Sequence, residues 1–388
     1  MPAGHLYSVG AVVADGKVWK KRHAVLRVRG AFARTVLLAT TALALAVGSA
    51  PDYLHRRVEQ LAARHSWSVV DWELRHLGAG LVLVVGQVVS PPDVTAARDR
   101  LAQLFRQRGA RDLTEPGLQR ALAAAVTDQL RASGVPTLGG AVFPPVAFSV
   151  GEPPSVVVVS PRSEIRLAEA VLLDEGISLE AAQAVETAVE RLNVSALVER
   201  TGGLSTYPTL VAPETDAFRA LQTIAHEWTH TALFFAPLGR AYGSNAQARA
   251  INETAADIVG QEVAERIAES IGERPPRQGG GGVDRVLSDR LRRIRVNVER
   301  LLALGAVDEA EAYMEQERVA LAAQGYAIRR LNQAFFAFHG NYAEGPAAST
   351  EIPDALRALR AQSASLGEFV ERVGQVTTVA ELKRMLAP

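Results

Sequence analysis

The sequence predicts an α+β fold that is mostly helical, with a small mixed sheet beside one central helix and a helical C-terminal part. Apolar residues recur at helical spacing over much of the chain. Runs rich in β-branched residues, separated by glycine and proline, are concentrated between positions 141 and 210. Nearly half of the 388 residues are apolar, enough to bury a large core in one large or two moderate domains.

Composition narrows the possible partners. The 42 basic residues balance the 42 acidic ones, so the chain offers no overall electrostatic footprint for nucleic acid. We therefore expect no nucleic-acid partner. The chain contains no cysteine, which excludes disulfides, thiolate metal ligands and cysteine nucleophiles.

The N-terminal region predicts an attachment to a membrane. Residues 1–34 are rich in basic side chains and precede an uncharged run over residues 35–50. This run is short for a spanning helix, which needs about 20 residues, and a cleavable signal ending at Ala46 or Ala50 is the alternative. The long basic stretch favours an uncleaved anchor at the cell membrane, with a cytoplasmic tail and the rest of the chain outside the cytoplasm. A cleaved signal would instead imply secretion.

Residues 51–134 form a predicted helical region. Helical periodicity covers Asp52 to Arg75, Val94 to Gln107 and Leu118 to Ala132. The first of these segments has an aromatic side that could lie on a bilayer surface or pack on the core. The apolar run from Leu77 to Val89 is too short to span a bilayer and predicts a buried strand or helix.

The predicted sheet follows between residues 135 and 274. Its β-rich runs are Ala141 to Val150, Ser155 to Ser160 and Ser195 to Leu210, and a predicted helix from Leu179 to Leu192 interrupts them. The last run contains Pro208, and proline is confined to sheet edges. We therefore expect an edge strand just before the central helix.

The central helix is predicted to begin near Asp216 and to end before Pro237. Thr215 or Asp216 can cap its first N–H groups, and proline cannot continue a helix. Apolar residues leave this helix little polar surface, which predicts burial. It nevertheless carries the sequence His226-Glu227-Trp228-Thr229-His230.

This motif predicts a metal site with its own general base. Residues four apart lie on one face of a helix, so both imidazoles can point at one ion while Glu227 lies one step round. A catalytic site needs a further protein donor and an open position for water. Glu253 can supply the donor from a second predicted helix that extends to Ala268. Asp257, one turn further on, could accept the free N–H of a ligating imidazole. The alternative is an ordinary amphipathic helix, whose buried histidines would lack partners.

HEWTH followed by Asn252-Glu253-Thr254-Ala255-Ala256-Asp257 resembles the gluzincin class of zinc metallopeptidases. The resemblance covers the segment from Gly202 to Ile267 and implies a zincin-like catalytic core over residues 135–274. The site residues that it implies are the Zn²⁺ ligands His226, His230 and Glu253, the general base Glu227, and Asp257 beside the ligands. A metzincin is excluded because no third histidine follows in the required arrangement, and the Gly-x-Met-Glu-Asn signature of one aminopeptidase group is absent.

The predicted edge strand is a candidate substrate shelf. In zinc peptidases the strand beside the active helix commonly holds an extended substrate by main-chain pairing. The residues expected to do so here are Gly203, Leu204, Ser205, Thr206 and Tyr207. The alternative is a structural hairpin around Gly202 and Gly203.

Residues 283–388 form a predicted helical C-terminal region that closes the cleft. A proline- and glycine-rich linker precedes it, and its two long helices, Val283 to Leu304 and Asp308 to Gln324, are expected to pair antiparallel. Within an aromatic-rich stretch, His339 or Tyr342 could donate a hydrogen bond to the oxyanion of the reaction. Alternatively, this stretch belongs to the core.

These features predict a zinc-dependent hydrolase, most simply a peptidase acting on peptide or protein substrates. A non-catalytic, metal-stabilised scaffold or binding protein is the alternative, but it would not need Glu227. A membrane-associated assembly factor, and a hydrolase of non-peptide amides or esters, also remain compatible with the sequence.

Overall fold

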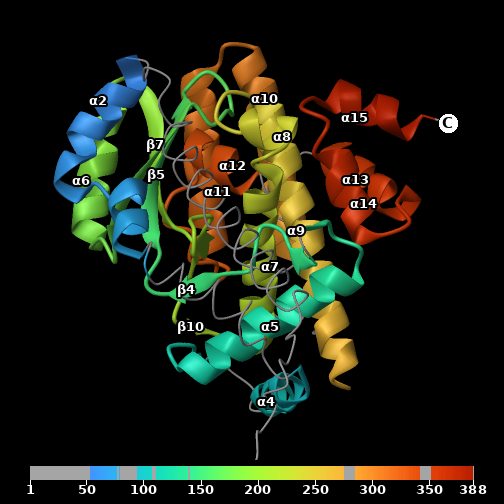
Figure 1. Ribbon diagram of the computed structural model, residues 1–388. Coiled ribbons are helices and arrows are strands. Elements are labelled where there is room, and N and C mark those ends of the chain that lie inside the picture. The colour runs from blue at the N-terminus through green and yellow to red at the C-terminus, as the bar shows by residue number, and fades with distance from the viewer. Residues whose placement is uncertain are drawn as a thin grey trace, which may run out of the picture. The chain divides into compact units, whose positions relative to one another are not determined.

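The structure is a computed structural model that describes residues 53–76, 78, 94–106, 111–138, 140–274, 285–340 and 351–387. The described residues are mostly helical with small mixed sheets, which confirms the predicted α+β class (Figure 1).

One sheet consists of three antiparallel strands in the order β6-β5-β7. These are β5 (Pro154–Pro161), β6 (Glu169–Glu175) and β7 (Val194–Arg200). Side chains alternate between the faces of a strand, and both faces of β5 are buried. Val157 and Val159 belong to one core cluster, whereas Val156 and Val158 belong to another. The sheet is therefore covered on both sides.

The face that carries Val157 and Val159 is covered by α2 (Tyr53–Ala62) and α6 (Leu179–Glu190). The face that carries Val156 and Val158 is covered by α10 (Arg285–Ala303), α11 (Val307–Ala322) and α12 (Gln333–His339) (Figure 1). Helices α10 and α11 form the antiparallel pair that the sequence predicts. Arg290 Nη2 lies 2.7 Å from Glu317 Oε2 across it.

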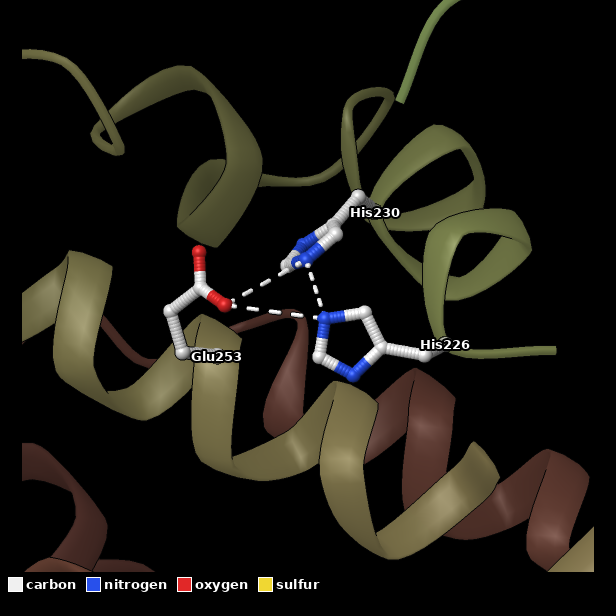
Figure 2. A group of neighbouring side chains, drawn as sticks. All are labelled: His226, His230 and Glu253. Atoms are coloured by element: carbon white, nitrogen blue, oxygen red, sulfur yellow. Dashed lines mark hydrogen bonds and ion pairs between the residues drawn. The ribbon is translucent and has the colours of Figure 1, made fainter. Parts of the chain in front are cut away.

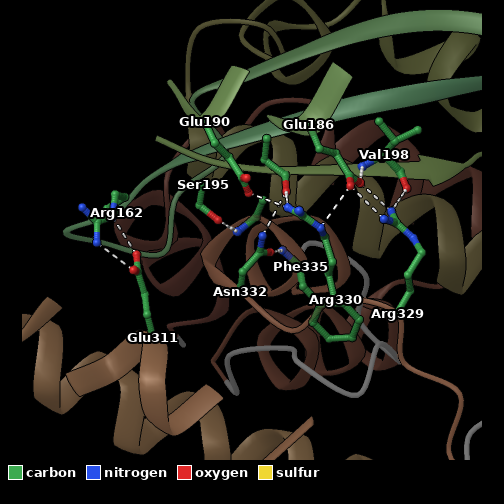
Figure 3. Close-up of polar contacts among 12 residues, drawn as sticks. Arg162, Glu186, Glu190, Ser195, Val198, Glu311, Arg329, Arg330, Asn332 and Phe335 are labelled. Atoms are coloured by element: carbon green, nitrogen blue, oxygen red, sulfur yellow. Dashed lines mark hydrogen bonds and ion pairs between the residues drawn. The ribbon is translucent and has the colours of Figure 1, made fainter. Parts of the chain in front are cut away.

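Polar side chains cover the outer edge of β7 (Figure 3). Arg329 Nη2 donates to Val198 O at 2.9 Å, and Asn332 Nδ2 donates to Ala196 O at 3.0 Å. Glu186 Oε1 accepts a hydrogen bond from Val198 N at 2.7 Å and also pairs with Arg329. Such cover blocks pairing of the strand with another chain, and it ties the segment before α12 to the sheet.

The largest core surrounds α7 (Ala217–Leu233) and α9 (Ala246–Ser270). Gly260 allows these two helices to approach closely, because a Cβ atom at this position would lie 2.7 Å from Gln222 O and 3.2 Å from His226 Cβ. Around this pair pack α4 (Val94–Arg106), α5 (Pro116–Ala132), α8 (Pro237–Arg240), α13 (Glu351–Gln362), α14 (Leu366–Val373) and α15 (Val379–Leu386).

A second small sheet lies beside α7. Its strands, in the order β4-β9-β8, are β4 (Phe148–Val150), β9 (Thr209–Val211) and β8 (Gly203–Leu204). Strand β8 pairs only with β9 among the described strands and is therefore an edge strand, but Pro208, on which the predicted edge strand rests, lies in the turn between β8 and β9. Two further antiparallel pairs join β1 (Arg111–Asp112) to β10 (Glu214–Thr215) and β2 (Thr137–Leu138) to β3 (Ala141–Val142).

The boundaries of the central helix agree with the sequence. Asp216 is the N-cap of α7 and accepts a hydrogen bond from Arg219 N at 2.9 Å. The helix ends at Leu233, before Pro237. The second helix is longer than predicted, since α9 begins at Ala246 with Asn245 as its N-cap.

The predicted location at the cell membrane is corrected. None of the helices in the described ranges is long and apolar enough to cross a bilayer, which takes about 20 apolar residues. The predicted cytoplasmic tail, residues 1–34, and the predicted anchor or signal, residues 35–50, lie outside the described residues, as do Leu77 and residues 79–89 of the predicted apolar run.

Candidate metal centre

Three side chains from α7 and α9 converge on one point (Figure 2). His226 Nε2 and His230 Nε2 are 3.0 Å apart, and each lies 3.6 Å from Glu253 Oε2. The two imidazoles come from successive turns of α7, and the carboxylate comes from the facing side of α9. This largely buried group could hold a metal ion.

Neighbouring side chains fix the orientation of both imidazoles. His230 Nδ1 lies 2.6 Å from Asn252 Oδ1, and His226 Nδ1 lies 3.0 Å from Asp257 Oδ1. Because each of these oxygens accepts a hydrogen bond, Nδ1 carries a proton, and Nε2 is the ring nitrogen that can bind a metal ion once it is deprotonated. Asp257 was assigned this kind of role from the sequence, whereas Asn252 was not.

Tyr242 is a second residue that sequence reasoning missed. It lies between α8 and α9, and its hydroxyl donates a hydrogen bond to Glu253 Oε1, the oxygen that points away from the imidazoles. Its ring also lies edge-on to that of His230, with centroids 6.0 Å apart. Tyr242 therefore steers the carboxylate so that Oε2 faces the two histidines.

The charges of the group are strongly coupled. Burial lowers the pKa of His226, but hydrogen bonds to Asp257 and Glu253 outweigh it and hold this pKa well above its ordinary value. Burial likewise lowers the pKa of His230, but the charge and hydrogen bond of Glu253, together with the charge of Glu227, outweigh burial and raise this pKa. Burial raises the pKa of Glu253, but the two imidazoles hold it well below the usual range. Without a metal, the carboxylates thus keep protons on the imidazoles.

Metal affinity is therefore expected to fall as the pH is lowered. A ligating imidazole must be deprotonated, and raised histidine pKa values mean that binding releases protons around neutral pH. For each proton released, the affinity should fall by about tenfold per pH unit. Calorimetric titration of zinc in buffers of different ionisation enthalpy measures this release. An affinity independent of pH between 6 and 8 would contradict the arrangement.

Glu227 lies beside this group without joining it. Its side chain is buried, with 9% exposed, and burial raises the pKa of its carboxyl group. A Cβ atom at Gly203 would lie 3.0 Å from Glu227 Oε1, so strand β8 runs directly along this carboxylate. A buried carboxyl group with a raised pKa suits proton transfer at neutral pH.

The five predicted shelf residues run along α7. Gly203 and Leu204 form β8, and Ser205 Oγ donates to the backbone oxygen of Glu227 at 3.1 Å. Thr206 is buried, and its hydroxyl donates to Pro208 O at 2.8 Å.

Tyr207 ends the shelf. Its backbone N–H donates to Glu73 Oε1 at 3.3 Å, and its hydroxyl donates to Pro145 O at 3.4 Å. Sequence reasoning gave no role to Glu73, a buried carboxyl group whose pKa is raised by burial. Burial also raises the pKa of the Tyr207 hydroxyl.

The structure places one of the two candidate oxyanion donors, His339, and its contacts are not with this group. His339 ends α12, where its Nε2 lies 3.6 Å from Glu199 Oε1 and its ring packs on Phe335 at 4.4 Å between centroids. These contacts lie beside β7, and none of its contacts within the described ranges is with a candidate ligand. Tyr342 lies outside the described residues. An oxyanion role for either residue stays a prediction.

Comparisons of the chain with models of protein families, with curated proteins and with solved structures found no match. The function must therefore be inferred from the side chains themselves.

Proposed function

We propose that this protein is a zinc-dependent peptidase of the gluzincin type with a zincin-like core. One observation carries the proposal: two imidazoles and a carboxylate converge while a fourth side chain, the Glu227 carboxylate, lies beside them and is not needed as a ligand. A scaffold that used a metal only for stability would gain nothing from burying this additional carboxyl group.

The residues present fit zinc. Imidazole and carboxylate are ordinary zinc donors, and zinc–ligand distances of about 2.0 to 2.2 Å imply ligand atoms about 3.3 to 3.6 Å apart in a tetrahedron. The separations between His226, His230 and Glu253, 3.0, 3.6 and 3.6 Å, are close to that range. Three protein ligands leave one position open, as in catalytic rather than structural sites.

The chain's own groups supply the proton transfers. When bound, zinc would contribute Lewis acidity, which lowers the pKa of a water molecule and polarises the scissile carbonyl. Glu227 accepts the proton of the attacking water and later delivers it to the leaving amine. Asn252, Asp257 and Tyr242 hold the three ligands in place.

Strand β8 holds the substrate in this proposal. Its outer edge has no partner strand among the described residues, and Gly203 places it against Glu227. An extended peptide can pair with such an edge through main-chain hydrogen bonds. This would lay the scissile bond beside the general base.

Adding one methyl group should test this arrangement. Gly203→Ala would bring Cβ to 3.0 Å from both Glu227 Oε1 and Thr223 Cγ2, so the shelf or the carboxylate must move. Because small misplacements of reacting groups are costly, we expect kcat to fall about tenfold to hundredfold with zinc content unchanged. Gly202→Ala is the matched control, since its Cβ would meet no atom within 4 Å. Equal rates in the two variants would remove β8 from the site.

The function itself is tested with a quenched-peptide library and a panel of nitrophenyl esters. The zinc-loaded protein should cleave peptides, lose this activity on chelation and regain it with zinc. Cleavage of the esters alone would instead indicate a hydrolase of non-peptide substrates. Bound zinc without any hydrolysis would indicate the metal-stabilised scaffold.

A further inference from the structure

Arg249 extends the ligand-bearing face of α9. It lies one turn before Glu253 and two turns before Asp257, so the three side chains follow one side of the helix. Glu253 and Asp257 both contact imidazoles of α7. Arg249 is thus the next side chain on the ligand-bearing face, towards the N-terminal end of α9.

The Arg249 guanidinium is held in place by Tyr242. Its Nε donates to Tyr242 O at 3.3 Å, and its Cζ lies 5.6 Å from the centroid of the Tyr242 ring. Tyr242 in turn donates its hydroxyl to Glu253. Two contacts therefore connect the guanidinium to a candidate ligand, and stacking fixes its position before any substrate binds.

The remaining donors of Arg249 are available. Its Nη1 and Nη2 make no hydrogen bond or ion pair with any residue of the described ranges, and the side chain is partly exposed. Arg360, by contrast, is held by both carboxylate oxygens of Glu262, at 2.7 and 2.8 Å. A fixed guanidinium with two free nitrogens matches the geometry of a carboxylate.

The negative charge of the metal centre favours a positive side chain beside it. Glu227, Glu253 and Asp257 bring three carboxyl groups together, whereas a divalent ion offsets only two negative charges. A substrate carboxylate near the metal centre would be repelled unless a positive group compensates. Arg249 is the guanidinium that lies on the ligand-bearing face.

We propose that Arg249 binds a carboxylate of the substrate and thereby selects peptides that carry a negative charge at one position beside the metal centre. This rests on the proposed peptidase function. The carboxylate is either the free C-terminus or an acidic side chain, and the test separates these two sources.

The test uses matched peptides and the zinc-loaded Glu227→Gln protein, which should bind without cleaving. One pair differs only in a free or amidated C-terminus, and a second set differs only in Glu or Gln at each position. In one of these comparisons we expect the charged peptide to bind about tenfold or more tightly, since hydrogen bonds between charged groups are strong. Titration calorimetry measures this ratio, and the comparison that shows it identifies the source.

Substitutions then assign the ratio to Arg249. Arg249→Gln should bring it to about one, whereas Arg249→Lys should keep only part of it because an ammonium lacks the planar fork. Arg240→Gln is the matched control, because the side chain of this exposed arginine donates only to Phe235 O in the described part of the chain. Zinc content and melting temperature show whether each variant is folded. If Arg249→Gln is not folded, the affinity ratio of Arg249→Lys decides whether Arg249 binds the carboxylate.

The outcomes separate this proposal from the peptidase function. A ratio unchanged in a folded Arg249→Gln protein means that Arg249 only packs on Tyr242, and the proposal is wrong. If no peptide is bound or cut, the proposed peptidase function is wrong. The carboxylate site is then tested by itself, with succinate in place of the peptides. Weaker succinate binding by Arg249→Gln than by Arg240→Gln would then uphold the carboxylate site, and equal binding would refute it.

Discussion

Replacing Glu227 by Gln is expected to abolish most hydrolysis while leaving zinc bound. The amide cannot accept the proton of the attacking water, and general acid–base catalysis contributes about a hundredfold to ten-thousandfold. The substitution keeps the size of a side chain that is 9% exposed, so the fold should persist. Steady-state rates on the best library peptide, with zinc measured in the same samples, test this expectation.

Glu269→Gln is the matched control for that experiment. It makes the same chemical change on an exposed residue at the end of α9 and should leave the rate unchanged. Loss of zinc in Glu227→Gln would mean that this carboxylate is a ligand rather than the base. An unchanged rate would remove Glu227 from the chemistry.

Replacing His230 by Ala is expected to remove stoichiometric zinc. Its Nε2 forms one corner of the ligand group, and the substitution also leaves Asn252 Oδ1 without its imidazole partner. Mutating residues behind the ligands typically costs tenfold to a hundredfold in affinity, so losing a ligand should cost more than about a hundredfold. Competition with a chelator of known affinity measures the loss.

Zinc should also raise the melting temperature of the wild type, because an ion that binds only the folded state stabilises it. This shift should disappear in His230→Ala and persist in His65→Ala. His65 is the control because it lies beside strand β6, where its Nδ1 is 3.4 Å from Asp174 Oδ2. Full zinc occupancy in His230→Ala would show that the ion binds elsewhere.

The parts of the site that the sequence predicts are those encoded by local signals. A helix brings His226 and His230 to one face whatever surrounds it, and Asp216 and Pro237 mark its ends through capping and breaking. Glu253 was predicted because a two-histidine centre requires another donor, which chemistry demands without any knowledge of the fold.

The parts that it does not predict depend on tertiary contacts. Tyr242 reaches Glu253 only because the turn after α8 brings it over the start of α9. Glu73 meets Tyr207 across 134 positions of the sequence. Strand β6 was missed because polar residues at its ends weaken the β-rich pattern, and its pairing with β5 supplies what local propensity lacks.

Zinc titration of metal-free wild-type protein tests the central claim most directly, with cleavage of the best library peptide followed at each step. The account predicts that hydrolysis is absent without metal, rises in proportion to added zinc and reaches its maximum at one equivalent. Hydrolysis that does not depend on zinc, or no hydrolysis once one equivalent is bound, would contradict it.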